Sequence, residues 1–246
     1  MRNRNRIIIF LFTIGVILCV IVQGIIIPDN AKRQKEYNIA QLDATTHDLD
    51  RILEYKSPYM GDASNDINLF YNLPLAVRNM TFQVISNELT FEVNYQDELI
   101  KAGELSKDTS KIIIHKTSNK TTNKTTNKTT NKTTNETTNK TTNKTTNETP
   151  DKAPEEGDDT PNYRREVYKD LIYNSTAAFA LIDNLENINY NFSDVSYSVT
   201  REGIEKLYNL PLSDLLTVKE WEAKVQNPLK NSDYIETSIN NAFIVR

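Results

Sequence analysis

Hydrophobic residues first gather near the amino terminus, where residues 7–27 carry no charge and a single Gln. Because an α-helix rises about 1.5 Å per residue, about 20 apolar residues cross the ~30 Å hydrocarbon core of a bilayer. The pattern therefore predicts a transmembrane helix over residues 7–27.

A basic stub of residues 1–6, with Arg2, Arg4 and Arg6, precedes this run. Such a stub favours an amino terminus inside the cell. We therefore expect a single-pass protein of the cell membrane whose remaining chain is extracytoplasmic. A cleaved secretory signal is the alternative, although no clear small-x-small site follows Ile27. Whether the segment is cleaved stays open.

The first half of the extracytoplasmic domain is expected over residues 42–100, after a polar juxtamembrane spacer at residues 28–41. Apolar residues at helical spacing predict a helix from Ile39 to Pro58; they are Leu42, Leu49, Ile52 and Leu53. A second, shorter helix is predicted to begin at Ser64 or Asn65 as its cap, to bury Ile67, Phe70 and Tyr71, and to stop before Pro74.

Two stretches show the period-two alternation of half-buried strands. In the first, Phe82 and Val84 are followed by a turn at residues 86–88 and then by alternating apolar residues from Leu89 to Tyr95. In the second, apolar residues alternate over 188–192 and again over 195–199. Each stretch predicts a β-hairpin with one buried and one wet face.

The second half of the domain, residues 160–246, opens with a long helical pattern. Thr160 and Pro161 suit the N-cap and the first helical position. Asn174 and Ser175 interrupt the apolar face, which predicts either a close backbone approach or a buried hydrogen bond. Three shorter helices are expected; they begin at Thr200, at Thr217 with a capping box to Glu220, and at Ser232 or Asp233, the last burying Ile235, Ile239 and Phe243.

Residues 101–159 separate the two halves and contain a tandem Asn-Lys-Thr-Thr tract without any apolar position. Nothing in the tract can offset the entropy of ordering it, so we expect a disordered low-complexity insert. Since neither half can bury its hairpin alone, both halves should share one core. The fold class predicted is α+β, with a small antiparallel sheet of two hairpins and helices packed on one face.

Composition narrows the function classes. Beyond Arg2, Arg4 and Arg6, the chain has 26 basic against 33 acidic residues, which does not suit nucleic acid. Its one cysteine, Cys19, lies in the predicted span, after large apolar residues that do not match a lipoprotein signal. The extracytoplasmic part must therefore be stabilised by its apolar core and not by disulfides.

No motif predicts catalysis, a cofactor or a bound metal. The two histidines, His47 and His115, have no ligand at metal-binding spacing, and neither His-Glu-x-x-His nor Gly-x-Ser-x-Gly occurs. Asp62, Ser64 and Asp66 begin like a calcium loop, but Leu73 stands where the loop needs Glu. A capped turn is the preferred interpretation.

Several short stretches carry a resemblance: LEYKSPYMGD at 53–62, NLPL at 72–75 and NSTAAFALIDN at 174–184. They are similar to a family of extracytoplasmic domains of unknown function from low-GC Gram-positive bacteria. That family occurs on small membrane-anchored proteins and lipoproteins, and on penicillin-sensing-type antirepressor metallopeptidases. The resemblance implies a bacterial source, which speaks against glycosylation of the Asn-x-Thr sites, and it singles out ten positions without a known role: Lys56, Pro58, Tyr59, Gly61, Asp62, Leu73, Pro74, Asn174, Phe179 and Asn184.

The favoured function is a non-enzymatic binding or sensing module at the cell surface, with an unknown extracellular ligand or envelope protein as partner. Exposed aromatic residues such as Tyr55, Tyr59 or Trp221 could line its groove. The alternative is a structural spacer protein of the cell envelope. An enzyme of unrecognised type comes third, because no catalytic constellation is visible.

Overall fold

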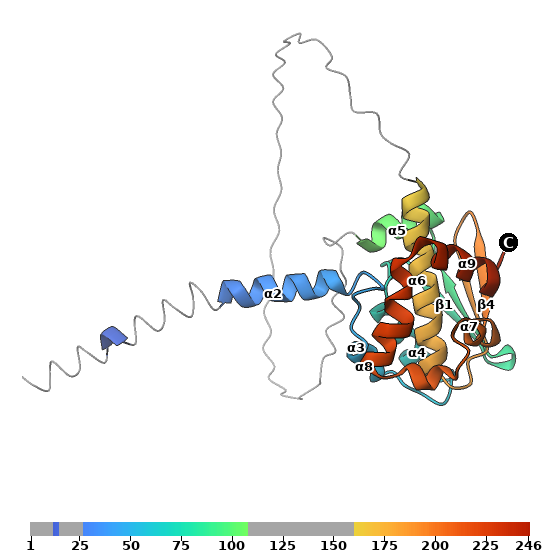
Figure 1. The fold of residues 1–246 in the computed structure, drawn as a ribbon, viewed down its shortest axis with the longest axis horizontal. Helices are drawn as coiled ribbons and strands as arrows, with labels where there is room; N and C mark the ends of the chain where they lie inside the picture. Colours follow the sequence, from blue (N-terminus) through green and yellow to red (C-terminus); the bar gives the residue numbers. More distant parts are fainter. Residues whose placement is uncertain (1–11, 15–26, 108–159) are drawn as a thin grey trace, which may run out of the picture. The chain divides into compact units, whose positions relative to one another are not determined.

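A five-stranded sheet organises the computed structural model, which describes residues 12–14, 27–107 and 160–246 (Figure 1). The strands are β1 (Thr81–Ile85), β2 (Thr90–Asn94), β3 (Asn187–Asn191), β4 (Ser196–Thr200) and β5 (Phe243–Val245). They lie side by side in sequence order. The predicted hairpins are both present, as β1–β2 and β3–β4, with the short 3₁₀ turn η2 (Ser86–Glu88) joining the first pair.

The sheet is mostly antiparallel, and one pairing differs from the prediction. Strands β2 and β3 run parallel, with Phe91 opposite Ile188 and Val93 opposite Tyr190. Parallel neighbours need a long crossover connection, and the chain between residues 95 and 186 supplies it. The two hairpins therefore join directly, so that both sides of the insert contribute to one sheet.

Helices make up most of the rest of the described fold. They are α2 (Ile27–Ala40), α3 (Asp50–Leu53), α4 (Ala63–Asn72), α5 (Leu99–Lys107), α6 (Thr160–Leu181), α7 (Arg201–Tyr208), α8 (Val218–Glu220) and α9 (Ser232–Ala242). Shorter turns are η4 (Leu212–Leu215), the π-helical η5 (Trp221–Gln226) and η6 (Pro228–Lys230). The predicted α+β class is confirmed, with a mostly antiparallel sheet that has five strands.

The long helix α6 is the centre of the helical layer (Figure 1). Sequence periodicity predicted one apolar face, yet every residue from 169 to 182 is buried. Such burial requires neighbours on all sides, and α6 contacts α4, α5, α7, α9, η4 and η5. The apolar core is continuous from Ala44 to Phe243 and includes the stacked rings of Phe70 and Phe91, 4.6 Å apart.

The helix predicted from Ile39 to Pro58 is wrong. Helix α2 ends at Ala40, residues 41–49 form turns, and α3 has four residues. The turns persist because a distant side chain satisfies their backbone: Gln226 donates to the carbonyls of Ala44 and His47, at 3.2 and 2.7 Å. The polar segment expected as a spacer at 28–41 is helical as α2.

The first half of the domain extends beyond residue 100, where the insert was predicted to begin. Helix α5 continues to Lys107 and packs on α6 so closely that a Cβ on Gly103 would lie 2.6 Å from Val167 Cγ2. Only glycine permits that approach. The rest of the predicted insert, residues 108–159, lies outside the described residues.

Helix ends follow the predicted capping chemistry in part. Thr200 accepts from the Gly203 N–H and Thr217 from the Glu220 N–H, as expected. Asp62, not Ser64 or Asn65, caps α4, and Asn231, not Ser232 or Asp233, caps α9. Phe243, placed in the last helix by its spacing, instead begins β5.

Among the described residues, no helix combines the length and apolar character needed to cross a membrane. The predicted span, residues 7–27, falls outside the description except for residues 12–14 and 27. The membrane anchor therefore stays a prediction.

Candidate functional site

The open face of the sheet carries three rows of short polar side chains. Register places Thr90, Asn187 and Thr200 in one row across β2, β3 and β4. The next rows are Glu92–Asn189–Ser198 and Asn94–Asn191–Ser196. Because side chains alternate along a strand, these rows share the face opposite the helices.

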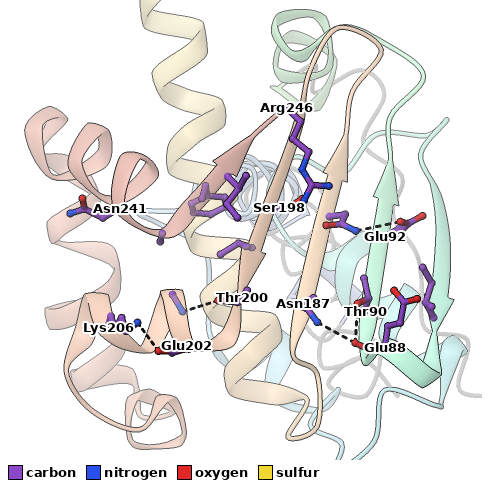
Figure 2. A pocket seen from close by; sticks show the side chains of 17 residues that line it. Glu88, Thr90, Glu92, Asn187, Ser198, Thr200, Glu202, Lys206, Asn241 and Arg246 are labelled. Carbon is purple, nitrogen blue, oxygen red and sulfur yellow. Dashed lines mark hydrogen bonds and ion pairs between the residues drawn. The ribbon is translucent and has the colours of Figure 1, made fainter.

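Hydrogen bonds between strands hold the amides of this face in place (Figure 2). Asn191 Nδ2 donates to Asn94 Oδ1 at 2.8 Å, and Asn189 Nδ2 donates to Glu92 Oε1 at 3.3 Å. Asn187 Nδ2 donates to the Glu88 carbonyl at 3.1 Å. Asn189 and Asn191 each donate one hydrogen bond to a side chain of β2, and Asn187 donates one to the η2 turn. Their carbonyl oxygens accept nothing from the described part of the chain, so they can accept from a ligand.

A groove of about 590 Å³ lies over the first two of these rows. One wall is helix α7, where Lys206 Nζ pairs with Glu202 Oε1, one turn earlier, at 2.6 Å. The end of α9 closes on α7 because Gly203 has no side chain; a Cβ there would lie 3.1 Å from the Ala242 carbonyl. Figure 2 shows Arg246 at the opposite end, with its side chain reaching over the sheet.

The groove combines amides, hydroxyls and a small apolar area. Exposed Ile244 of β5 lies opposite Ser198 and continues the central row. Glu88, Glu92 and Arg246 are its charged groups besides the Glu202–Lys206 pair. This mixture suits an uncharged ligand rich in hydroxyl groups, which can donate to and accept from amides while its C–H faces contact Ile244.

A second hollow of about 520 Å³ lies between the turns at 45–49 and the segment 218–230. It borders a buried chain of hydrogen bonds. Trp221 Nε1 donates to the Tyr173 hydroxyl at 3.1 Å, this hydroxyl bonds His47 Nδ1 at 2.9 Å, and His47 Nε2 bonds the Asn72 carbonyl at 2.7 Å. Nε2 must donate to the carbonyl, so in the neutral imidazole Nδ1 has no proton and accepts from the Tyr173 hydroxyl.

Burial accordingly lowers the pKa of His47 to about 4, even though the Asn72 carbonyl favours the charged form. The side-chain nitrogens and the hydroxyl in this series of hydrogen bonds therefore all have partners within the fold. Trp221 borders the second hollow, but the residue is only 1% exposed and therefore offers a ligand almost no surface. Of the aromatics proposed for binding, Tyr55 is half-buried and its hydroxyl accepts from Asn72 Nδ2, while Tyr59 is 67% exposed but lies outside both hollows.

Half of the ten positions singled out by the resemblance serve the fold. Asn174 Nδ2 donates to the Pro74 carbonyl at 2.7 Å, so of the two alternatives left open for this position the buried hydrogen bond is present. Asn184 Oδ1 accepts from the Met60 N–H at 2.7 Å. Phe179 lies beneath the Arg201 guanidinium, whose nitrogens donate to three carbonyls at the end of α6, and Leu73 is buried.

The other five positions form one exposed loop: Lys56, Pro58, Tyr59, Gly61 and Asp62. Backbone bonds of Ser57 to Leu181 and Asp183 attach this loop to the end of α6. Asp62 caps α4, which agrees with the capped turn preferred over a calcium loop. The loop and the groove are separate, since none of these residues lines the groove.

Asp66, the third residue of the rejected calcium pattern, is fully buried without a partner on either carboxylate oxygen. Burial, and secondarily the charge of Asp62, raise the pKa of Asp66 to about 7. Within the described ranges, no three His, Cys, Asp or Glu residues gather in a way that could hold a metal ion.

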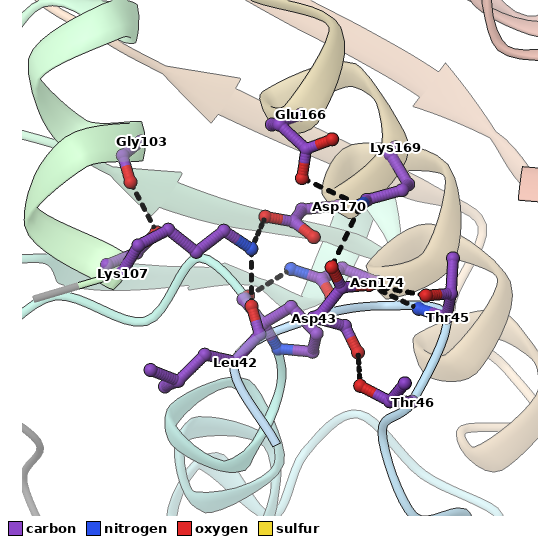
Figure 3. Close-up of polar contacts among 12 residues, drawn as sticks. Leu42, Asp43, Thr45, Thr46, Gly103, Lys107, Glu166, Lys169, Asp170 and Asn174 are labelled. Carbon is purple, nitrogen blue, oxygen red and sulfur yellow. Dashed lines mark hydrogen bonds and ion pairs between the residues drawn. The ribbon is translucent and has the colours of Figure 1, made fainter. Parts of the chain in front are cut away.

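A charged cluster joins α5 and α6 to the turn at residues 42–46 (Figure 3). Lys107 Nζ bonds the buried Asp170 carboxylate at 2.9 Å and also the Leu42 carbonyl. Lys169 bridges Asp43 and Glu166 at 3.1 and 2.7 Å. Burial raises the pKa of Asp170 despite the neighbouring Lys107. The pairing ties the residues before the insert to the helix after it, which is a structural role.

No family model, curated protein or solved structure matches the chain.

Proposed function

We propose that this chain is a non-enzymatic binding module, held in the cell membrane by residues 7–27 with its folded domain outside, and that its open sheet face binds a neutral glycan of the cell envelope. The supporting observation is the set of three polar rows on β2, β3 and β4. Strands give these rows a rigid spacing, which lowers the entropic cost of binding.

The polar groups of the groove favour a glycan over a polyanion. Asn187 and Asn189 carry no charge, and the Lys206 ammonium is paired with Glu202. The other charged lining groups are two carboxylates and one guanidinium, so no excess of positive charge faces the ligand. A nucleic acid or a teichoic-type polyanion needs unpaired cations in a row, and among the described lining residues only Arg246 is one.

A co-sedimentation assay tests the proposal. The full-length chain is mixed with purified peptidoglycan sacculi and, separately, titrated with soluble N-acetylglucosamine oligomers. We expect retention on the sacculi, and we expect the double change Asn187→Ala with Asn189→Ala, two residues that line the groove, to weaken it about tenfold or more, since each lost polar contact in a site costs about 1 kcal/mol.

Asn68→Ala is the matched control, because Asn68 is an exposed asparagine of α4, in the helical layer on the other face. It should bind as the unaltered chain does. Equal retention of all three proteins, or retention of none, would contradict the proposal. Retention abolished by excess anionic polymer but not by N-acetylglucosamine oligomers would assign the groove to a charged ligand instead.

A further inference from the structure

The outer edge of strand β1 is unpaired. The strand is the first in the sheet order and bonds only to β2. Among the described residues, no backbone hydrogen bond outside the sheet involves residues 81–85. Its sequence, TFQVI, contains neither a charged residue nor a proline. Proteins usually protect edge strands with such residues, so this edge has the properties of a pairing surface.

The side chains of this strand are also incompletely covered. Phe82 and Val84 face the core but are only half-buried, and Ile85 is half-buried on the open face. Phe82 contacts the rings of Phe70, Tyr71 and Phe91 on its inner side. A further strand beside β1 would bury the remaining apolar area of both core-facing residues.

We propose that a second copy of this chain pairs with β1 through its own β1, antiparallel and centred on Gln83, which joins the two sheets into one of ten strands. In this register Phe82 lies opposite Val84 of the second copy, and Thr81 lies opposite Ile85 of the second copy. The two Gln83 amides meet at the twofold axis and can bond to each other. Every pair keeps its side chains on matching faces of the sheet.

The self-matching pattern is what favours a second copy over an extended peptide of another protein. A twofold interface requires that the same patch complement itself. The sequence TFQVI complements itself about Gln83. The aromatic Phe82 faces the β-branched Val84 of the second copy, the two Gln83 amides face each other, and no like charges meet. The proposal is independent of the glycan proposal, because Gln83 does not line the groove.

Opposite charges at one position test this pairing. The full-length chain, its Gln83→Lys variant and its Gln83→Glu variant are compared by analytical ultracentrifugation in a neutral detergent. We expect the unaltered chain to dimerise with concentration. Each variant should weaken the dimer about fivefold or more, because identical charges meet at the axis. An equimolar mixture of the two variants should restore dimerisation.

Two controls separate this effect from a change in folding. Ser198→Lys adds the same charge at the centre of the same face and should leave dimerisation unchanged. Within one chain Gln83 lies opposite Glu92, so lysine there is favourable and glutamate unfavourable. An effect on the fold would therefore differ in sign between the two variants, whereas an effect on the dimer has one sign. A monomeric unaltered chain, or variants that dimerise as it does, would overturn the proposal.

Discussion

The two faces of the sheet use the same five strands for different purposes. On the covered face, Phe91, Tyr190 and Val199 are at most 2% exposed and pack under the helices. One residue away on each strand, Glu92, Asn189 and Ser198 are part of the groove. A shift of one position thus changes a residue from a source of stability to a candidate ligand contact. The comparison predicts large effects on folding from one face and small ones from the other.

The largest effect is expected from the covered face. Phe91→Ala removes a buried ring that stacks on Phe70 and contacts Phe82. We expect the free energy of unfolding to fall by about 3–5 kcal/mol, from lost burial and the cavity left behind. Urea denaturation of the full-length chain measures it. Glu92→Ala, the next residue on the open face, is the control, and an equal loss from both changes would refute the division.

The carboxylate of Asp66 is buried on the covered side and has no hydrogen-bond partner among the described residues. Asp66 has a pKa of about 7 in the fold but about 3.8 when unfolded, so the folded state holds the proton more tightly. Stability from this residue is complete below pH 3.8 and is lost as the pH rises through 7. Asp66→Asn should stabilise the protein by roughly 3 kcal/mol at pH 8 and have little effect at pH 4.

His47 gives the opposite dependence. Its pKa of about 4 in the fold lies below the unfolded value of 6.5, so stability is lost as the pH falls from 6.5 through 4. The two residues therefore oppose each other over that range. In the Asp66→Asn variant, the loss of stability as the pH rises from 5 to 8 should become smaller in thermal unfolding, while the loss toward acid pH remains. A variant that lost as much stability as the unaltered chain between pH 5 and 8 would show that Asp66 is not the titrating group.

Two asparagines extend the comparison: Asn174 on the covered side of the sheet and Asn189 on its open face. Asn174 is 1% exposed and donates to the Pro74 carbonyl, which ties the segment after α4 to α6. Asn174→Ala leaves that carbonyl unpaired in the core, so we expect a loss of about 1–3 kcal/mol in the free energy of unfolding. The measurement is again urea denaturation. A loss below 0.5 kcal/mol, roughly the size of a surface change, would contradict the role assigned to this bond.

The sequence predicted local features well. Alternation located both hairpins, and the interruption at Asn174 predicted two alternatives, of which the buried hydrogen bond is present. Pairings between distant segments were not accessible in the same way. The residues of strand β2 do not indicate that β3 will pair with it in parallel. Phe243 fits the spacing of the last helix as well as it fits a strand. The turns at 41–49 depend on Gln226, more than 170 residues away, so a local helical pattern gave the wrong element there.

The groove was missed for the same physical reason. Glu92, Asn187 and Asn189, which line it, are ordinary polar residues within their own strands. They become a surface only because β2 and β3 are neighbours in the sheet. The sequence did contain a signal for this surface, because asparagine recurs at alternate positions in β3. Asparagine is uncommon in strands, whose exposed positions more often hold threonine, lysine or glutamate. The aromatic residues chosen instead, above all Trp221, were large enough to be needed in the core.

The smallest effect on stability should come from Asn189→Ala. The residue is half-buried, and its only bond among the described residues is the 3.3 Å contact with Glu92 Oε1. We expect the free energy of unfolding to change by less than about 0.5 kcal/mol. Retention on peptidoglycan sacculi should nevertheless decrease, in contrast to Asn174→Ala at a temperature where that variant stays folded. If instead Asn189→Ala destabilised the fold as much as Asn174→Ala, the open face would be a structural surface. Its polar rows would then carry no argument for a ligand.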